Sequence, residues 1–458
     1  MEDMKNGKRS SFSGKLGYVL AAAGASVGLG NIWRFPYLAA KYGGGIFLII
    51  YIVLALTFGY TMIVAETAIG RMTRKSPVGA FKSFGKKKWL SFGGWINAVI
   101  PVLIVPYYSV IGGWVIKYLV EYFRGNAKLL AEDGYFTDFI SNGVSTELCF
   151  VAFCAFTLII IFAGVQNGIE RVSKIMMPIL IVLSVIIAVY SVTRPGALAG
   201  VKYFLVPNVK NFSWMTVVSA MGQMFYSLSI AMGILITFGS YMKKDTAIED
   251  STRNVEIFDT GIAIMAGLMI IPAVFAFSGG DPDTLQAGPS LMFITIPKVF
   301  QNMGFGTVIG IVFFLLVLFA AVTSSIALTE SAVSTFEDEL GWGRNKATVL
   351  VGVIMLALGS LSSLGYGPLE GINIIGMQFL DLFDFLTNSV MMPIAALLTS
   401  LLVSRVVGID KIEDEIIHGE SAFRRKKVFV VMIKYLCPVF AIIILLSSVA
   451  NALGWIKM

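Results

Sequence analysis

Long apolar stretches alternate with shorter polar connectors along the whole chain. Each stretch is about as long as the ~20 residues that an α-helix needs to cross ~30 Å of hydrocarbon, or longer. The pattern therefore predicts an all-α integral membrane protein with 11 transmembrane helices. We expect these helices at residues 16–38, 45–70, 91–123, 146–164, 170–193, 214–241, 255–279, 306–338, 346–364, 375–404 and 426–451.

The composition argues against a soluble protein. Of 458 residues, 57% are hydrophobic and 14% are charged, and the mean hydropathy is +0.81. A soluble fold of this size needs far more polar surface to cover its core. The polar opening MEDMKNGKRSSFSGK (1–15) is followed by no small-residue cleavage site, so we expect no removable signal peptide. Cys149, Cys154 and Cys437 lack metal-ligand spacing and are expected to be packed thiols.

Lysine and arginine are concentrated in every second connector. They precede the first expected helix and follow the second, fourth, sixth, eighth and tenth. The positive-inside rule then predicts a cytoplasmic N-terminus and an external C-terminus, in the inner or plasma membrane of a cell. The net charge of +7 is thus a signal of topology and requires no nucleic-acid partner. On the outside, connectors 124–145 and 280–303 are long enough to carry structure, and the second is amphipathic, which suits a cap over an opening.

The first expected helix contains the unusual stretch GASVGLGNIWRFP (24–36). Glycine costs about 1 kcal/mol against alanine in a helix, so clustered glycines mark a place where the helix is easily interrupted. Broken backbone at membrane depth is tolerated only where it lines a cavity or binding site. Close packing of glycines between helices is the alternative for this segment taken alone.

A second interruption, GQMFYSLSIAMG (222–233), lies in the sixth expected helix. The first and sixth helices each begin a block of five, and paired interruptions at matching positions indicate an inverted-repeat transporter. Half-helix N-termini then offer amides to an anion, and the other broken ends offer carbonyls to cations. The expected organisation is a cytoplasmic segment 1–15, repeats 16–193 and 214–404, a cytoplasmic loop 405–425, and an eleventh helix with a short C-terminus at 426–458.

Six motifs in this order resemble the neurotransmitter:sodium symporters, which have the LeuT-type 5+5 inverted-repeat fold. They are VGLGNIWRFPY (27–37), GGGIFLIIY (43–51), the tyrosine pair 107–108, GQMFYSLS (222–229), TSSIAL (323–328) and LDLFDF (380–385). The resemblance covers nearly the whole chain. It implies discontinuous first and sixth helices, and secondary active transport of a small amine or amino acid driven by sodium.

The resemblance also implies two sodium sites. The ligands of the first would be the carbonyls of Gly24, Val27 and Ala320 and the hydroxyls of Thr323 and Ser324. The ligands of the second would be the carbonyl of Ser26, the side chains of Asn31, Ser227 and Asp259, and the substrate carboxylate. Neutral oxygen ligands suit a hard cation that must be released again. For Thr323 and Ser324, ordinary hydrogen bonding back to their own helix is the alternative.

Asp259 is a lone aspartate within an apolar helix, which is a functional hypothesis by default. Many members of the family have asparagine here and bind chloride nearby. The chloride pattern is partly present in Tyr51, Gln223 and Ser227, but Ala263 stands where serine or glutamate is typical. We therefore expect Asp259 to supply the negative charge itself, so that transport does not require chloride.

The substrate class follows from Gly28, because amine-transporting relatives carry an aspartate at this position. Without that carboxylate the substrate should bring its own, which favours an amino acid. The implied substrate site comprises Ala25, Ser26, Gly30, Ile104, Tyr108, Tyr226, Ser227, Ser229, Met232 and Leu328. It contains no charged side chain, so a hydrophobic amino acid, aliphatic or aromatic, is expected. Tyr226 departs from the usual phenylalanine and Ala231 from the usual glycine.

The resemblance places an extracellular gate at Arg34 and Asp384, with Gln223 near Arg34. Ion pairs that form and break suit gates because their net stability is small. Glu66, in the second helix, would be a buried partner for the broken backbone of the sixth helix.

The same resemblance places a cytoplasmic gate at Arg9 and Asp338, with Tyr241. Membership of the cytoplasmic positive cluster is a strong alternative for Arg9. No role is assigned to Asp381 or His418, and His418 is expected to be a solvated loop residue.

The sequence thus predicts a sodium-coupled symporter that imports a hydrophobic L-amino acid by alternating access. Its expected partners are the amino acid, two sodium ions and membrane lipid, and the sequence leaves the oligomeric state open. A nontransporting sodium-dependent amino-acid sensor and a channel-like permease remain as alternatives. An enzyme is disfavoured, because one histidine and scattered cysteines offer no pairing of nucleophile and base.

Overall fold

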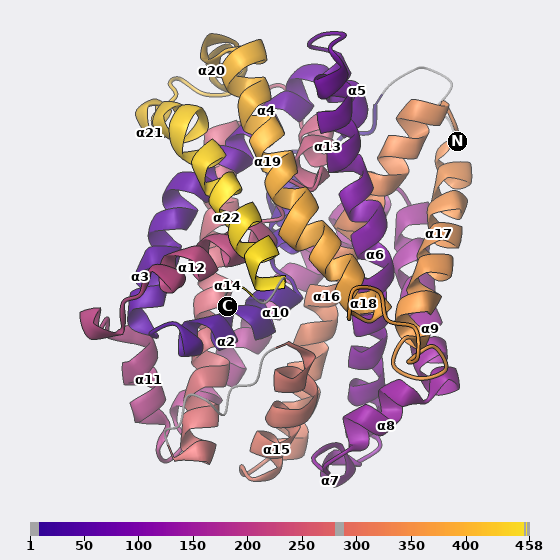
Figure 1. Cartoon of the computed structure of the whole chain (residues 1–458), viewed down its shortest axis with the longest axis vertical. Helices are drawn as coiled ribbons and strands as arrows, with labels where there is room; N and C mark the ends of the chain where they lie inside the picture. Colours follow the sequence, from indigo (N-terminus) through magenta and orange to yellow (C-terminus); the bar gives the residue numbers. More distant parts are fainter. Residues whose placement is uncertain (1–8, 280–287, 453–454, 456–458) are drawn as a thin grey trace.

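The computed structural model describes residues 9–279, 288–452 and 455, and they form an all-α structure without strands (Figure 1). Nine apolar helices of this part are long enough to cross a membrane. They are α3–η3–α4 (Gly45–Thr73), α6 (Lys88–Phe123), α9 (Gly143–Phe162), η4–α10 (Val165–Val192), α14 (Ile248–Ser278), α16 (Gly306–Leu340), α17 (Arg344–Leu364), α18–η8–α19–η9 (Phe379–Val407) and α21–η10–α22 (Lys426–Asn451).

Two further membrane-length segments are interrupted. α1 (Lys15–Ser26) and η2–α2 (Gly30–Lys41) are bent by 53° at the first interruption. α12 (Trp214–Ser227) and α13 (Ile234–Tyr241) are separated by a stretch without regular helix. With each pair taken as one broken span, the expected helices are confirmed, including the discontinuous first and sixth. The largest shift is the start of α14 at Ile248 instead of residue 255, because a polar first turn extends the helix beyond its apolar part.

Short helices lie in the connectors, where the sequence predicted structure only for 124–145 and 280–303. They are α5 (Pro77–Lys82), α7 (Ala127–Leu130), α8 (Tyr135–Ser141), α11 (Ala197–Leu205), η5 (Val209–Asn211), η7 (Leu291–Thr295), α15 (Ile296–Gln301) and α20 (Ile409–Ile417). Figure 1 shows α5 and α20 at one end of the molecule, and α7, α8 and α15 at the other. We call these ends the N-terminal face and the opposite face. Of the expected cap at 280–303, residues 280–287 lie outside the described residues, as do residues 1–8 of the N-terminal segment.

The helices pack as two groups. α4 packs against α13 and α14, and α1 and α2 pack against α14. α6, α9, α16 and α17 pack against one another. α1 and α13 also contact α16, so the broken helices of the first group face the second group.

The connector 408–425 joins the tenth and eleventh spans and fastens them to α4. Arg71, at the N-terminal-face end of α4, is fully buried, and its Nε donates to Glu415 Oε1 at 2.7 Å. Its Nη1 donates to the carbonyl of Thr246 at 2.5 Å, and its Nη2 donates to the carbonyl of Glu415. A buried charge pair of this kind is stable only if every polar atom around it is satisfied, which these contacts achieve.

A reciprocal exchange of hydrogen bonds fastens the same connector to α14. The Glu249 carboxylate accepts the backbone N–H groups of Arg424 at 2.8 Å and Arg425 at 2.9 Å. In return, Glu420 Oε1 accepts the N–H groups of Glu249 at 2.5 Å and Asp250 at 3.4 Å, which are unpaired donors in the first turn of α14. We refer to Arg71, Glu249, Glu415 and Glu420 as the clasp.

Candidate substrate and ion site

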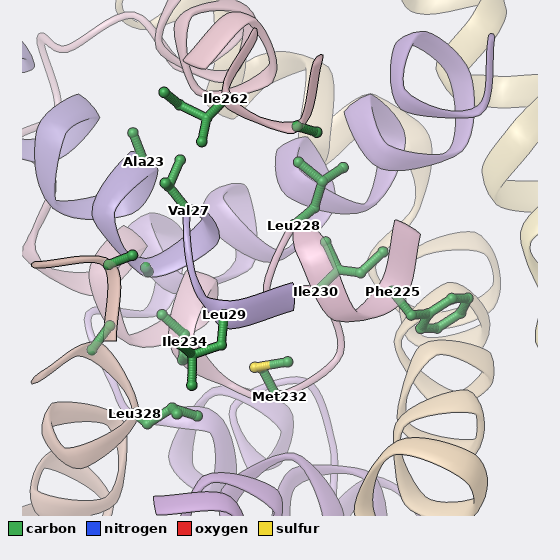
Figure 2. Close-up of a cluster of buried hydrophobic side chains, with 14 of the residues drawn as sticks. Ala23, Val27, Leu29, Phe225, Leu228, Ile230, Met232, Ile234, Ile262 and Leu328 are labelled. Carbon is green, nitrogen blue, oxygen red and sulfur yellow. The ribbon is translucent and has the colours of Figure 1, made fainter. Parts of the chain in front are cut away.

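The two interruptions leave the helical conformation in different ways. In the first, Val27 is extended, with φ −75° and ψ 94°. In the second, Ser229, Ala231 and Gly233 have φ of 52°, 59° and 73°, the left-handed region that favours glycine. The side chains of Val27 and Leu29 and those of Leu228, Ile230 and Met232 belong to one buried hydrophobic cluster (Figure 2).

The backbone of the second interruption is held by Glu66 of α4. Glu66 Oε1 accepts the N–H of Ala231 at 2.7 Å, and its fully buried Oε2 has no hydrogen-bond partner among the residues that the structure describes. This contact joins α4 to the second interruption, as the sequence predicted for Glu66. It also helps to hold Ala231 in a left-handed conformation, which costs roughly 1–3 kcal/mol for a residue other than glycine.

A small cavity of ≈ 30 Å³ lies between the interruptions. Its lining residues are Ala25, Ser26, Gly28, Leu29, Gly30, Asn31, Ile104, Tyr108, Tyr226, Ser229, Met232, Ser324 and Leu328. The structure therefore brings together nine of the ten expected substrate residues, and the tenth, Ser227, lies directly behind Asn31 at 2.8 Å. No lining residue is charged.

Polar groups of one broken helix bind backbone atoms of the other. The Ser229 hydroxyl donates to the carbonyl of Ala25 at 2.9 Å, and Gln223 Nε2 donates to the carbonyl of Gly30 at 3.0 Å. The hydroxyl of Tyr108 accepts the N–H of Leu29 at 3.3 Å. Backbone groups of the first interruption are thus bound by side chains around this cavity, where the sequence predicts free amides and carbonyls.

Two glycines of the first interruption are required by close approach. A Cβ on Gly28 would lie 2.7 Å from Ser324 Oγ and 3.1 Å from the Tyr108 hydroxyl oxygen. A Cβ on Gly30 would lie 2.2 Å from the ring of Tyr226. A side chain at position 28, such as a carboxylate, would therefore lie between Tyr108 and Ser324 and force one of them to move. The ring of Tyr226 packs directly against the backbone at Gly30 in the first interruption.

Asp259 lies at the centre of a buried polar cluster. Its Oδ1 accepts Asn31 Nδ2 at 2.8 Å and the Ser227 hydroxyl at 2.9 Å, and its Oδ2 accepts the Tyr51 hydroxyl at 3.0 Å. All four side chains are at most 1% exposed. The three side chains expected at the second sodium site, Asn31, Ser227 and Asp259, thus meet, and Tyr51 of the expected chloride pattern joins them.

The remaining parts of the chloride pattern stand apart from this cluster. Gln223 binds the carbonyl of Gly30 and makes no hydrogen bond to Asp259 among the described residues. Ala263 is fully buried, four residues further along the same helix, and brings no polar atom.

The expected ligands of the first sodium site also lie together. The hydroxyl oxygen of Ser324 is within 3.3 Å of the carbonyl oxygen of Gly24 and 3.4 Å of that of Val27. Thr323 instead donates back to its own helix, to the carbonyls of Phe319 at 3.0 Å and Ala320 at 3.2 Å. The alternative of helix back-bonding therefore holds for Thr323, whose oxygen keeps a lone pair, but not for Ser324, which reaches across to α1.

A cavity of ≈ 390 Å³ lies above Tyr226, toward the opposite face, and is lined by Arg34 and Asp384. We call it the vestibule. Among the described residues no ion pair within 4 Å joins these two side chains, so the expected gate is not closed. The guanidinium of Arg34 lies over the ring of Tyr226, 5.3 Å from its centroid. Gln223, expected near Arg34, donates to the carbonyl of Gly30 in the same short helix η2 (Gly30–Arg34).

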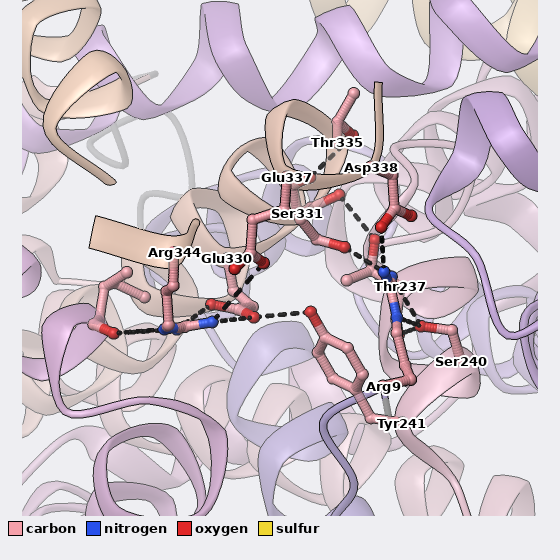
Figure 3. A network of polar contacts seen from close by, with 12 residues as sticks. Arg9, Thr237, Ser240, Tyr241, Glu330, Ser331, Thr335, Glu337, Asp338 and Arg344 are labelled. Carbon is pink, nitrogen blue, oxygen red and sulfur yellow. Dashed lines mark hydrogen bonds and ion pairs between the residues drawn. The ribbon is translucent and has the colours of Figure 1, made fainter. Parts of the chain in front are cut away.

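The N-terminal face is closed by a polar network (Figure 3). Arg9 Nη1 pairs with Asp338 Oδ1 at 2.5 Å, and Arg9 Nη2 donates to Ser334 at 2.7 Å. The guanidinium also lies 5.0 Å from the ring centroid of Tyr241. The structure therefore brings the three expected gate residues together, and Arg9 is more than a member of a positive cluster.

Sequence reasoning missed half of this network. Arg344 donates to Glu330 at 2.6 Å, and Glu330 also accepts the Tyr241 hydroxyl at 2.7 Å (Figure 3). Glu337 lies 4.0 Å from Arg344. A signal was present, because Glu330 is a carboxylate within an apolar helix and such residues are usually functional. Asp381 lines the vestibule and accepts the Tyr366 hydroxyl at 3.3 Å. His418 is an exposed residue beside Asp414, as expected.

Two broken helices, a small apolar cavity between them, and oxygen clusters beside it define the class of a membrane transporter. The chain matches the Sodium:neurotransmitter symporter family over residues 9–129 and 136–455. It belongs to this family. Because the family consists of transporters, the prediction that the protein is not an enzyme is confirmed.

Individual relatives agree with this assignment. An uncharacterised sodium-dependent transporter of Bacillus subtilis, YhdH, is 34% identical over 97% of this chain and 99% of its own length. An uncharacterised sodium-dependent transporter of Haemophilus influenzae is 31% identical over the same shares of the two chains. The crystal structure of MhsT in complex with L-phenylalanine matches 96% of this chain and 100% of its own, with 34% identity and a TM-score of 0.86.

Proposed function

We propose that the protein is a sodium-coupled symporter that takes up a hydrophobic L-amino acid, aliphatic or aromatic, without requiring chloride. The observation that carries this proposal is the cavity between the two interruptions. Its backbone groups suit the ammonium and carboxylate of an amino acid, and its side chains Ile104, Met232 and Leu328 suit an apolar side chain. The likeness to a structure that contains L-phenylalanine supports the same substrate class.

The proposed sodium coupling is supported by the carbonyl and side-chain oxygens that lie beside the cavity. The carbonyls of Gly24 and Val27 with Ser324 would hold one ion, together with Ala320 and Thr323. Asn31, Ser227 and Asp259, with the Ser26 carbonyl, would hold the second ion beside the substrate carboxylate. A carboxylate shared between ion and substrate couples their binding, because each improves the site of the other.

Chloride independence rests on Asp259. Its carboxylate already receives three hydrogen bonds within the buried cluster, so a fixed negative charge stands beside the proposed second sodium. A diffusible anion at this place would add a second negative charge within a few ångströms of the first, which is unfavourable in a buried site.

The orientation of the chain is part of the proposal. We propose that the N-terminal face is cytoplasmic and that the vestibule opens to the outside, as the distribution of lysine and arginine predicts. Arg9, Asp338 and Tyr241 would then form the inner gate, and Arg34 and Asp384 the outer gate. The structure has the inner pair formed and the outer pair apart, which corresponds to access from the vestibule.

The test is uptake by proteoliposomes of labelled leucine, tyrosine and tryptophan, with and without an inward sodium gradient. Accumulation of any of them only with the gradient is expected, at equal rates in chloride and gluconate. Binding without accumulation would indicate a sensor, and flux that ignores the gradient would indicate a channel-like permease; either would overturn the proposal.

A matched pair of serine variants tests whether uptake depends on the cavity. S229A removes a hydroxyl that lines the cavity and should lower uptake at limiting substrate by about tenfold, the equivalent of one hydrogen bond to a charged group. S184A removes a hydroxyl that also binds a backbone carbonyl, at 2.8 Å, but in α10 away from the cavity. It should leave uptake unchanged.

A further inference from the structure

The Asp384 carboxylate is held by neutral donors at the wall of the vestibule. Asn388 Nδ2 donates to Asp384 Oδ1 at 2.6 Å, and the Tyr107 hydroxyl donates to the same oxygen at 3.2 Å. Asn388 Nδ2 also lies 3.3 Å from the Tyr107 oxygen, so the three side chains form one compact group. Thus Asp384 has its charge partly satisfied without Arg34.

Asn388 is placed for this contact by the local fold. It lies four residues after Asp384, where α18 (Phe379–Asp384) continues into the π-helix η8 (Phe385–Met391), so the two side chains emerge on the same side. The Oδ1 atom of Asn388 is buried and, within the described part of the chain, has no hydrogen-bond partner. The side-chain amide of Asn388 therefore makes its hydrogen bonds through the nitrogen, and this nitrogen points toward Asp384.

Arg34 has an alternative partner of its own across the vestibule. Its guanidinium lies over the ring of Tyr226, a contact worth about 0.5–2 kcal/mol depending on its exposure. Each member of the expected outer gate is therefore engaged elsewhere. To pair with Asp384, Arg34 must leave the ring of Tyr226 and the Asp384 carboxylate must shift toward it. Such a shift strains the hydrogen bonds that Oδ1 accepts from Asn388 and Tyr107, although Oδ2 can accept the guanidinium.

We propose that Asn388 is a positioning residue that holds Asp384 away from Arg34 and so sets the balance between the open and the closed outer gate. The inference rests on the proposed transport function for the roles of Arg34 and Asp384. Asn388 touches neither substrate nor ion and acts only through Asp384. Loss of its donor makes the open arrangement less stable and leaves Asp384 free to pair with Arg34.

The test measures access to the central cavity and needs no transport. A reporter cysteine, Ile104→Cys, lies below Tyr226, and the parent chain without it gives the blank. N388A should slow the reaction of this cysteine with a hydrophilic thiol reagent in the purified protein by about tenfold, the equilibrium value of one charge-assisted hydrogen bond. N126A is the matched control. It removes a hydrogen bond that an asparagine donates to a carboxylate, from Asn126 to Glu121 at 2.6 Å, away from the vestibule, and it should leave the labelling rate unchanged.

A double-mutant cycle separates positioning from a general effect on folding. In a D384N background, N388A should have no further effect on the labelling rate, since the residue works only through the carboxylate. Y107F removes the second donor to Asp384 and should slow labelling in the same direction as N388A, which keeps the test informative if N388A does not fold. Unchanged labelling in both N388A and Y107F, or equal effects of N388A with and without D384N, would overturn the role.

Failure of the two proposals can be told apart. If the labelling effects appear but the parent shows no sodium-driven uptake, the proposed function is overturned and the role of Asn388 in access stands. If the parent takes up amino acids normally and labelling is unaffected, the role of Asn388 is overturned and the proposed function stands.

Discussion

Replacement of Asp259 by asparagine should convert the proposed chloride-independent sodium site into one that depends on chloride. The carboxylate receives three hydrogen bonds, from Asn31 at 2.8 Å, Ser227 at 2.9 Å and Tyr51 at 3.0 Å. Asparagine has the same shape, but it is neutral and keeps only one acceptor oxygen. The substitution therefore removes the charge with little change in packing.

The magnitude follows from these contacts. A hydrogen bond to a charged group contributes about 1.5–3 kcal/mol, and D259N loses at least one of them. If that energy supports the ion-bound state, the sodium affinity falls by about 10- to 100-fold, at 1.4 kcal/mol for each factor of ten. A chloride ion beside the neutral amide would return the missing negative charge and restore most of the affinity.

The assay is the sodium concentration for half-maximal amino-acid uptake, measured in chloride and in gluconate. The unaltered protein should give the same value in both salts. D259N should need about 10- to 100-fold more sodium in gluconate and recover in chloride. D381N is the matched control. Asp381 also accepts a tyrosine hydroxyl, at 3.3 Å, but it lies outside the buried polar cluster around Asp259, so D381N should leave the sodium dependence unchanged. Equal sodium dependence of D259N in both salts, at the parent value, would refute the reasoning.

Three further substitutions test other parts of the structure. G28A places a methyl group 2.7 Å from a serine oxygen and should weaken amino-acid binding at least tenfold in an equilibrium binding assay, whereas G222A, which meets nothing within 4 Å, should not. E415A leaves the buried Arg71 without its ion-pair partner and should lower the free energy of unfolding by about 3–5 kcal/mol. The control E413A removes the partner of the half-exposed Lys426 and should lower it by about 0–1 kcal/mol, both measured by thermal unfolding. R9A should raise the reactivity of a cysteine placed inside the polar network of the N-terminal face, and equal reactivity would contradict its gate role.

The sequence predicts the helices well because hydrocarbon imposes a simple condition on them. A span must be long and apolar whatever its neighbours are, so its ends can be located without knowing the packing. The interruptions are visible for a related reason. Glycine, serine and asparagine within an apolar run, as in 24–36 and 222–233, are costly unless the backbone there is used.

The arrangement of charged partners was predicted less completely. Arg34 and Asp384 were expected to pair, yet each has a competing partner. Tyr226 was expected in the substrate site and not beside Arg34, and no motif marked Asn388. Glu330 and Arg344 meet because α16 and α17 turn back on each other through a short connector. Which charges meet depends on tertiary geometry that hydropathy does not encode.

The clasp breaks the symmetry of the fold. The predicted repeats make α4 and α14 equivalent second members of two inverted halves, and an inverted repeat alone would give the two faces similar energies. Arg71 on α4 and Glu249 on α14 are both bound by the connector 408–425, which belongs to neither half and exists on one face only. The two faces are therefore unequal in the described residues: on the N-terminal face one connector holds the ends of α4 and α14 together, so these two helices are expected to move there as a single unit.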